Sequence, residues 1–384
     1  VTLMTALYFH ALRPQDRVAV KPHASPVFHV IQYLMGHQSQ ENLQNFRAKG
    51  GAQSYPSRTK DADDVDFSTG SVGLGPAMTA FSSIVQDYLR RHHDDFRREE
   101  PGRMIAVVGD AEMDEGNMYE ALWEGWKHGL RNTWWIVDYN RQSLDGVVPD
   151  QMFRLIDRVF RTTGWNVITI KYGKRMMEAF ERPGGKRLRR WINDCPNDLY
   201  SALTFRGGAA WRQQLDKDFA DDDDALRLIE SYDDDALQNL MTNLGGHCLE
   251  TLMEAFDEAS KDETPTCFIA YTIKGWGLPL AGHKDNHAGI LNDEQVDGFR
   301  TKLGIKQGHE WEPFAGLEER QSVLKEFLEH VPFNREGRRR YEADKIEVPT
   351  SFPTPVKGKG STQEAFGKIL YELAGDKKSK LADR

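Results

Sequence analysis

Two oxygen-bearing side chains, Asp110 and Asn140, each follow an apolar stretch rich in β-branched residues. Their separation is 140 − 110 = 30 positions, enough for one helix to cross between two neighbouring parallel strands. The carboxyl ends of such strands meet at one edge of the sheet, where ligands of open α/β folds bind. We therefore expect a carboxylate and a carboxamide to converge there.

This pair has the chemistry of a magnesium site for a diphosphate. Mg²⁺ prefers oxygen ligands and takes only one or two protein side chains, while phosphate oxygens and water complete its octahedron. Asp110 would supply charge, Asn140 a neutral oxygen, and the main-chain carbonyl of Gln142 a third protein ligand, because its strand has ended. The alternative is an ordinary turn with a helix N-cap, which often follows a strand as Gly-Asp.

The residues around Asp110 favour a phosphate ligand. Gly109 permits close approach of the main chain, and the amides of Ala111 and Glu112 would open a helix towards phosphate oxygens. We expect Gly109, Asp110, Ala111, Glu112 and Asn140 to contact the metal-bound diphosphate of a cofactor.

The elements that position these residues alternate between strand and helix. Helical spacing predicts helices over 76–91, 152–162 and 249–260, and apolar runs predict strands over 104–109, 133–137, 165–170 and 267–271. The predicted fold class is α/β, with a mostly parallel sheet covered by helices on both faces.

We predict three divisions of the chain. Residues 1–346 form the diphosphate domain, with an acidic helical insertion near 197–246 whose aspartate runs we interpret as helix caps. Residues 347–360, rich in Pro, Gly and Lys, read as a linker. Residues 361–384 start a further domain with an amphipathic helix. Residues 1–12 read as a helix already under way, so we expect truncation at both ends.

The segment from Met104 to Gly146 resembles the thiamine diphosphate motif of the transketolase superfamily, which begins Gly-Asp-Gly and ends about thirty residues later in Asn. Ala111 replaces the second glycine, and the backbone amide that the motif uses is retained. Within the superfamily, the chain is most similar to the homodimeric bacterial first component of pyruvate dehydrogenase. The supporting stretches are HASP (23–26), NFRAKGGAQSYP (45–56), EMDE (112–115), LDG (144–146), GWNVI (164–168) and GGH (245–247).

The resemblance implies further site residues. In FSTGSVGLGPAM (67–78), Gly70 and Val72 would contact the cofactor, as would Lys274 in YTIKGWG (271–277). His23 matches a histidine near the substrate, although Lys21 and Pro22 replace the usual glutamine and glycine before it. His287 matches a histidine of a mobile loop used in acyl transfer, and His283 is a further candidate. Without the resemblance, loop histidines are most often solvated side chains with no chemical role.

The function implied is thiamine diphosphate- and Mg²⁺-dependent oxidative decarboxylation of pyruvate or a related 2-oxo acid. The acyl group would pass to the lipoyl-bearing acyltransferase component of a multienzyme complex, and the enzyme would be a homodimer with the cofactor between subunits. One alternative is transketolase activity, to which Thr69-Gly70-Ser71, Glu115-Gly116 and Trp123-Glu124 are similar. Another is a non-catalytic assembly subunit that keeps the fold.

Composition agrees with these expectations. The 384 residues carry 50 basic and 59 acidic side chains, a net charge of −9, which argues against a nucleic-acid partner. Mean hydropathy is −0.63 and no apolar run of about eighteen residues occurs, so we expect no membrane span. Cys195, Cys248 and Cys267 lack metal-ligand spacing, and their odd number fits a reducing cytoplasm.

Overall fold

The computed structural model describes residues 1–97, 100–143, 146–148, 150–287, 289–334, 351 and 359–376. It separates into two compact units, Val1–Arg339 and Arg340–Arg384, and each is described by itself. Within these ranges, no helix combines the length and apolar composition needed to cross a bilayer.

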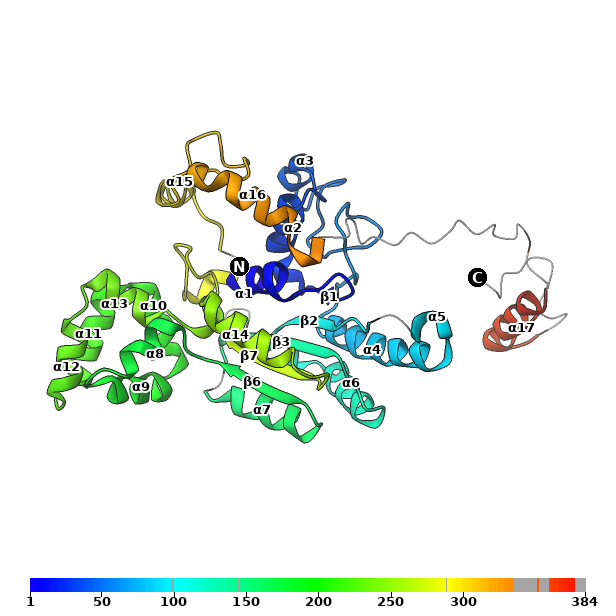
Figure 1. The fold of residues 1–384 in the computed structure, drawn as a ribbon, viewed down its shortest axis with the longest axis horizontal. Coiled ribbons are helices and arrows are strands. Elements are labelled where there is room, and N and C mark those ends of the chain that lie inside the picture. Colours follow the sequence, from blue (N-terminus) through cyan, green and yellow to red (C-terminus); the bar gives the residue numbers. More distant parts are fainter. Residues whose placement is uncertain are drawn as a thin grey trace. The chain divides into compact units, whose positions relative to one another are not determined.

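A five-stranded parallel sheet forms the centre of the first unit (Figure 1). Its spatial order is β1 (Arg17–Ala19), β2 (Met104–Gly109), β3 (Thr133–Tyr139), β7 (Thr266–Tyr271) and β6 (Asn166–Ile170). All four strand pairings are parallel. The α/β fold class predicted from the sequence is confirmed.

The central strands β2, β3 and β7 are mainly apolar because both faces of the sheet are covered there. Along β2, Ile105 and Val107 enter one hydrophobic core, whereas Ala106 and Val108 enter the other. This alternation follows from the two-residue period of a strand. Parallel sheets of this kind are buried on both faces by their crossover helices.

The two cores contain different helices. The first includes buried residues of α4 (Leu74–His92), α6 (Gly116–Lys127) and α7 (Met152–Thr162). The second includes those of α1 (Thr2–Ala6), a π-helical turn (Leu7–Ala11) and α14 (Leu249–Ala259). Figure 1 shows α1 and α14 above the sheet and α6 and α7 below it. Because β7 inserts between β3 and β6, a right-handed crossover places α14 on the opposite face from α7.

The segment after β2 differs from the expected helix. Asp110–Asp114 forms a short 3₁₀ helix, and α6 begins only at Gly116. Glu115, with φ −81° and ψ 131°, is extended and separates the two. The other predicted helices and strands are present, with ends shifted by at most two residues, except that residues 1–12 form α1 and the π-helical turn.

A helical lobe follows β6. It comprises α8 (Lys174–Phe180), α9 (Gly185–Asp194), α10 (Asn197–Arg206), α11 (Gly208–Asp218), α12 (Asp223–Glu230) and α13 (Asp234–Met241). The acidic runs begin two of these helices, because Asp222 accepts from the N–H of Ala225 and Asp233 from that of Ala236. These aspartates therefore act as N-caps.

Shorter elements complete the description. They are α2 (Ser25–Leu34), α3 (Gln40–Gln44), α5 (Asp94–Arg97), the hairpin of β4 (Gln142–Ser143) and β5 (Gly146–Val147), α15 (Asp293–Lys302) and α16 (Gln321–Glu329). In the second unit, α17 (Thr362–Gly375) is capped by Ser361, whose hydroxyl accepts from the N–H of Glu364. Most of the linker expected over 347–360, and Leu144 and Asp145 of the LDG stretch, lie outside the described residues.

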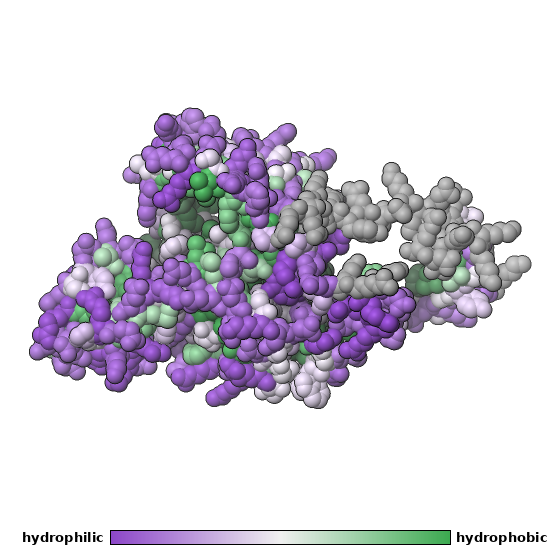
Figure 2. All heavy atoms as spheres, in the orientation of Figure 1, coloured by the Kyte–Doolittle hydropathy of each residue, from purple (hydrophilic) through white to green (hydrophobic). Residues whose placement is uncertain are grey.

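The surface of the first unit is polar. Figure 2 shows hydrophilic residues over most of the visible face, and hydrophobic residues mainly in the hollowed middle of the view. This distribution agrees with the content of charged residues, 28% of the chain.

Candidate active site

The structure brings the ends of β2 and β3 together as neighbours, with Gly109 opposite Asp138. Asp110 follows β2, and its Oδ2 accepts a hydrogen bond of 2.7 Å from the main-chain N–H of Arg141, the residue after Asn140. The Asp110 side chain is almost fully enclosed, since only 1% of the residue is exposed. A buried carboxylate therefore lies directly beside the second strand end.

The surroundings of Asp110 disfavour its charge. Burial, and then repulsion by Asp138, raise the pKa of its carboxyl to about 6, although the N–H of Arg141 and the charge of Lys21 act in the opposite direction. A carboxylate in this situation gains from a bound proton or a bound cation. The site is thus suited to a metal ion.

Asn140 and Gln142 supply further oxygens. Asn140 Oδ1 accepts from the main-chain N–H of Gln142 at 3.0 Å and keeps a second lone pair. We expected strand structure to have ended before Gln142. In the structure, Gln142 instead begins β4 and lies opposite Val147. The carbonyl of Arg141 accepts from the N–H of Val148, so the Gln142–Val147 pair is non-hydrogen-bonded. Both main-chain groups of Gln142 therefore point away from β5, on the side of Asn140.

The loop before α4 is tied to this motif by Glu112. One carboxylate oxygen of Glu112 accepts from the N–H of Gly109 and the other from that of Gly73, each at 3.0 Å. Gly73 has φ +77°, and a Cβ there would lie 2.6 Å from Asn117 Oδ1, so glycine is required. Gly70 and Val72, in the same loop, are exposed.

The amide of Ala111 is engaged within the motif. It donates to Asp110 Oδ1 at 3.0 Å and opens a 3₁₀ helix rather than the long helix expected. Its contact with a phosphate stays a prediction.

Lys21, Asp138 and Thr272 are in contact at this edge, which the sequence did not indicate. Lys21 Nζ lies 2.5 Å from Asp138 Oδ2, and the hydroxyl of Thr272 donates to the other oxygen of Asp138. Burial lowers the pKa of Lys21, whose side chain is 9% exposed, but the charge of Asp138 outweighs this effect and the net pKa is raised. The substitution at Lys21 was visible in the sequence, whereas its partner lies 117 positions away.

His23, Lys274 and His287 form a second group. The rings of His23 and His287 lie 5.1 Å apart between centroids and nearly perpendicular, and Lys274 Nζ lies 2.8 Å from His287 Nδ1. Burial and then the charge of Lys21 lower the pKa of His23, so its ring is neutral at pH 7. The structure thus gathers two predicted catalytic residues and one predicted cofactor residue. His283 packs instead on Phe205, at 4.6 Å between ring centroids.

His247 is a site-edge residue for which the sequence indicated no role. Its Nε2 accepts from the N–H of Ile273 at 2.8 Å, and its ring stacks on Trp276 at 4.5 Å. Burial lowers its pKa to about 3, so the ring is neutral and its Nδ1 carries the proton. Gly246 is needed before it, because a Cβ there would lie 2.6 Å from the carbonyl oxygen of Tyr271.

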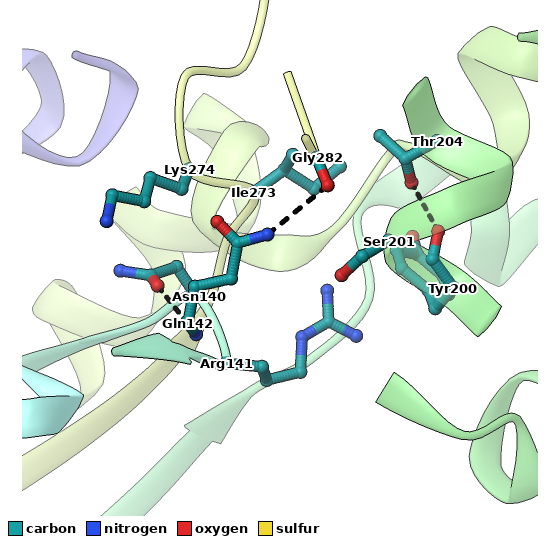
Figure 3. A pocket seen from close by; sticks show the side chains of 9 residues that line it. All are labelled: Asn140, Arg141, Gln142, Tyr200, Ser201, Thr204, Ile273, Lys274 and Gly282. Atoms are coloured by element: carbon teal, nitrogen blue, oxygen red, sulfur yellow. Dashed lines mark hydrogen bonds between the residues drawn. The ribbon is translucent and has the colours of Figure 1, made fainter. Parts of the chain in front are cut away.

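A cleft opens beside these groups. It is lined by Asn140, Arg141, Gln142, Tyr200, Ser201, Thr204, Ile273, Lys274 and Gly282. Figure 3 shows Asn140 and Lys274 on one side of this cleft, while Arg141 extends towards Tyr200 of α10. Gln142 Nε2 donates to the carbonyl of Gly282 across it, at 3.3 Å.

Comparison with known proteins relates part of this chain to one protein family. Residues 12–182 match the family model described as transketolase, thiamine diphosphate binding domain. These residues are therefore similar to the thiamine diphosphate-binding domain of the transketolase superfamily. The resemblance found in the sequence motifs is therefore confirmed.

Several relatives of this chain share one name, pyruvate dehydrogenase E1 component. The chain is 28% identical over 384 residues to the pyruvate dehydrogenase E1 component of Cupriavidus necator, and the match covers 94% of this chain and 42% of that protein. It is 28% identical over 302 residues to the protein of that name from Escherichia coli strain K12, covering 76% and 33%. The chain therefore spans between one third and about two fifths of the length of these relatives.

Solved structures of transketolases share the fold of this chain. The transketolase from Leishmania mexicana matches with a TM-score of 0.59 and 16% identity, over 87% of this chain and 41% of that one. The transketolase from Campylobacter jejuni matches with a TM-score of 0.56 and 18% identity, over 97% and 50%. The thiamine diphosphate-binding fold expected from the sequence is thereby confirmed.

The matched residues include most, but not all, of the residues that meet at the site. Lys21, His23, Asp110, Asn140 and Gln142 lie within residues 12–182. Lys274 and His287 lie beyond them. Their proximity to His23 comes from the fold, because β7 returns to the centre of the sheet.

Proposed function

We propose that this chain forms the diphosphate-binding part of a thiamine diphosphate- and Mg²⁺-dependent enzyme. The proposed reaction is oxidative decarboxylation of pyruvate or a related 2-oxo acid, with acyl transfer to a lipoyl carrier. The observation that carries the proposal is the buried Asp110 carboxylate, held beside Asn140 in a domain of the thiamine diphosphate-binding type. The names of the relatives support the choice of substrate.

The donors present fit the metal. Asp110, Asn140 and the main-chain carbonyl of Gln142 would bind Mg²⁺ through hard oxygen atoms. The raised pKa of Asp110 supports this assignment, because a divalent cation would compensate a charge that the chain leaves unbalanced. Gly70, Val72, Gly109, Ala111, Glu112 and Lys274 are the proposed cofactor contacts.

When bound, thiamine diphosphate supplies a nucleophilic carbon and an electron sink for cleavage next to a carbonyl. Residues of this chain would donate protons to the reacting groups and accept protons from them. A lysine ammonium has only donors, so Lys274 makes Nδ1 of His287 an acceptor and leaves the ring proton on Nε2. His287 can therefore donate to an anionic or carbonyl oxygen, and neutral His23 beside it can accept a proton.

A second copy of the chain is the proposed partner at the surface of α4 and α6. Phe81, Val85 and Tyr88 follow a four-then-three spacing on α4, and Trp123 and Trp126 lie three apart on α6. All five side chains are between 48% and 58% exposed. Residues at this spacing share one face of a helix, and exposed apolar side chains gathered on one face are typical of an interaction surface. A homodimer would bury it.

The wider setting remains part of the proposal. The multienzyme complex and the lipoyl-bearing component are suggested by the names of the relatives. The three cysteines are free thiols, which supports the cytoplasmic location inferred from the sequence.

Transketolase activity is the second candidate, favoured by solved transketolases that share the fold. A non-catalytic assembly role is less well supported. Asp110 and Asn140 would have no reason to keep hydrogen bonds suited to a metal in a subunit without a cofactor.

The test is a substrate comparison on the longest chain that contains this sequence, loaded with thiamine diphosphate and Mg²⁺. Decarboxylation of pyruvate with no ketol transfer between pentose phosphates is the expected result. Asp110→Ala should abolish turnover, whereas Asp114→Ala, which changes an exposed carboxylate of the same 3₁₀ helix, should preserve it. Ketol transfer without pyruvate turnover would favour the second candidate.

A further inference from the structure

A second cavity lies at the same edge of the sheet, beyond the hairpin of β4 and β5. Tyr139, Lys171 and Tyr271, at the ends of β3, β6 and β7, line one side of it, and α9 and α10 line the other. Its volume is about 80 Å³. A single water needs roughly 10–15 Å³ measured in the same way, so the cavity has room for a small ligand.

Two cations face this cavity, Arg141 and Lys171. Among the described residues, no carboxylate forms an ion pair with either side chain. The guanidinium of Arg141 lies 4.4 Å from the ring centroid of Tyr200 and makes one long hydrogen bond, 3.4 Å, to the carbonyl of Thr272. Lys171 Nζ contacts a neutral acceptor, Asn193 Oδ1, at 2.5 Å. Both positive charges therefore lack an anionic partner.

Two polar atoms of the cavity wall also lack a hydrogen-bond partner. They are the hydroxyl of Tyr271, a residue 3% exposed, and Nε of Arg141, a residue 7% exposed. Leaving a buried polar group without a hydrogen-bond partner is unfavourable, because the group has lost its bonds to water. An oxygen-rich ligand could accept from both groups.

Two carboxylates, Asp150 and Asp194, also line the cavity and balance the formal charge of Arg141 and Lys171, but among the described residues neither forms an ion pair with these cations. Asp150 Oδ1 is engaged with the N–H of Asn197 at the start of α10, and Asp194 is the other acidic residue of the lining. Burial, and then repulsion by Arg141, lower the pKa of Lys171 to about 8, with further repulsion from Arg189 and Arg154 and attraction from Asp194. The cationic charges thus prevail at Lys171.

We propose that this cavity binds a small oxyanion, a phosphate group, between Arg141, Lys171 and the hydroxyl of Tyr271. Arg and Lys are the side chains that bind phosphate oxygens most strongly, and a tyrosine hydroxyl can add a third donor. This cavity shares Arg141 and Tyr200 with the cleft beside Asn140, but binding of phosphate in it does not depend on the proposed activity.

The two sites are connected through one residue. The main-chain N–H of Arg141 donates to Asp110, while its side chain faces the phosphate cavity. A phosphate bound to the guanidinium would therefore act on the residue that holds the carboxylate of the metal site.

The test is calorimetric titration of inorganic phosphate into the full chain without cofactor or metal. Lys171→Gln should weaken binding about tenfold or more, because a hydrogen bond to a charged group is lost. Tyr271→Phe should weaken it by roughly threefold to tenfold. Lys174→Gln is the matched control, since Lys174 pairs with Glu254 outside the cavity, and should leave phosphate affinity unchanged.

Circular dichroism of each variant separates lost binding from lost folding, and Tyr271→Phe keeps the shape of the wall. Phosphate affinity equal to that of the unaltered chain in both variants would overturn the proposal, since it would place the ion elsewhere, including the cofactor site. A parallel titration with glycerol phosphate identifies the source: equal affinity indicates the phosphate group of a metabolite, and weaker binding indicates free phosphate.

Discussion

Replacing Asp110 by Asn should stabilise the metal-free chain. Its carboxyl has a pKa of about 6 against an ordinary value of 3.8, so the ionised form is disfavoured by about 3 kcal/mol in the folded state. Asn carries no charge and nearly the same shape. It has one carbonyl oxygen, however, and cannot accept from both Ala111 and Arg141, a loss of about 1 kcal/mol. The net gain in the free energy of unfolding is therefore about 2 kcal/mol at a pH near 8.

The gain should depend on pH with a definite sign. The folded-state pKa of Asp110 is raised, so the native chain binds this proton more tightly than the unfolded chain does. The unaltered chain consequently gains stability as pH falls through about 6, by roughly 1.4 kcal/mol between pH 8 and pH 5, whereas Asp110→Asn has no carboxyl to titrate there. The stability difference between the two should shrink by that amount.

Urea denaturation followed by tryptophan fluorescence measures both free energies at each pH. Asp114→Asn is the control, because Asp114 is exposed and should give a difference close to zero at both pH values. Asp110→Asn chains that are less stable than the unaltered chain at about pH 8, or a difference that does not change with pH, would refute the electrostatic account of this site.

Three further changes test other parts of the site. In Glu112→Gln, the side chain has one carbonyl oxygen and can no longer accept from the N–H groups of both Gly73 and Gly109. The affinity for thiamine diphosphate, measured by calorimetry, should therefore fall about tenfold. Unchanged affinity would show that these two hydrogen bonds do not support the cofactor site. His287→Ala should spare decarboxylation, measured with an artificial oxidant, and slow acyl transfer to a lipoyl acceptor; equal losses in the two assays would reject that role. Trp123→Glu should shift the protein towards monomers in sedimentation, while Leu155→Glu, an exposed apolar position on α7, should not; a stable dimer in the first variant would exclude the α4–α6 surface as the interface.

The sheet could be predicted where strands are buried on both faces. The strands β2, β3 and β7 read as continuous apolar runs, because parallel strands between two layers of helices expose neither face. Their order could not be predicted, since nothing in the local pattern places β7 between β3 and β6. The proximity of His23 to His287 depends on that order.

Local structure at the site was harder to foresee. The 3₁₀ turn after β2 accompanies the carboxylate of Glu112, which bonds back to Gly109 and across to the Gly73 loop. Arg141 adopts φ +65°, a conformation that non-glycine residues rarely take, and composition gives no sign of it. This backbone geometry accompanies the bond from Arg141 to Asp110, which local sequence patterns do not encode.

Long-range ion pairs are the part that a single sequence does not contain. In the sequence, Lys21 differs from the family pattern, and Asp138 is simply the residue after the strand expected over 133–137. The fold brings Lys21 and Asp138, which are 117 positions apart, into an ion pair at this edge of the sheet. The position of His247 at the site likewise depends on a contact that the sequence does not indicate, the hydrogen bond that its Nε2 accepts from the N–H of Ile273.

The most direct test of the central proposal is calorimetric titration of thiamine diphosphate into the longest chain that contains this sequence, with and without Mg²⁺, at a pH above 6 where Asp110 is ionised. We predict binding that requires Mg²⁺ and that disappears in Asp110→Ala. Binding of equal affinity without Mg²⁺, or binding that survives in Asp110→Ala, would contradict the proposal.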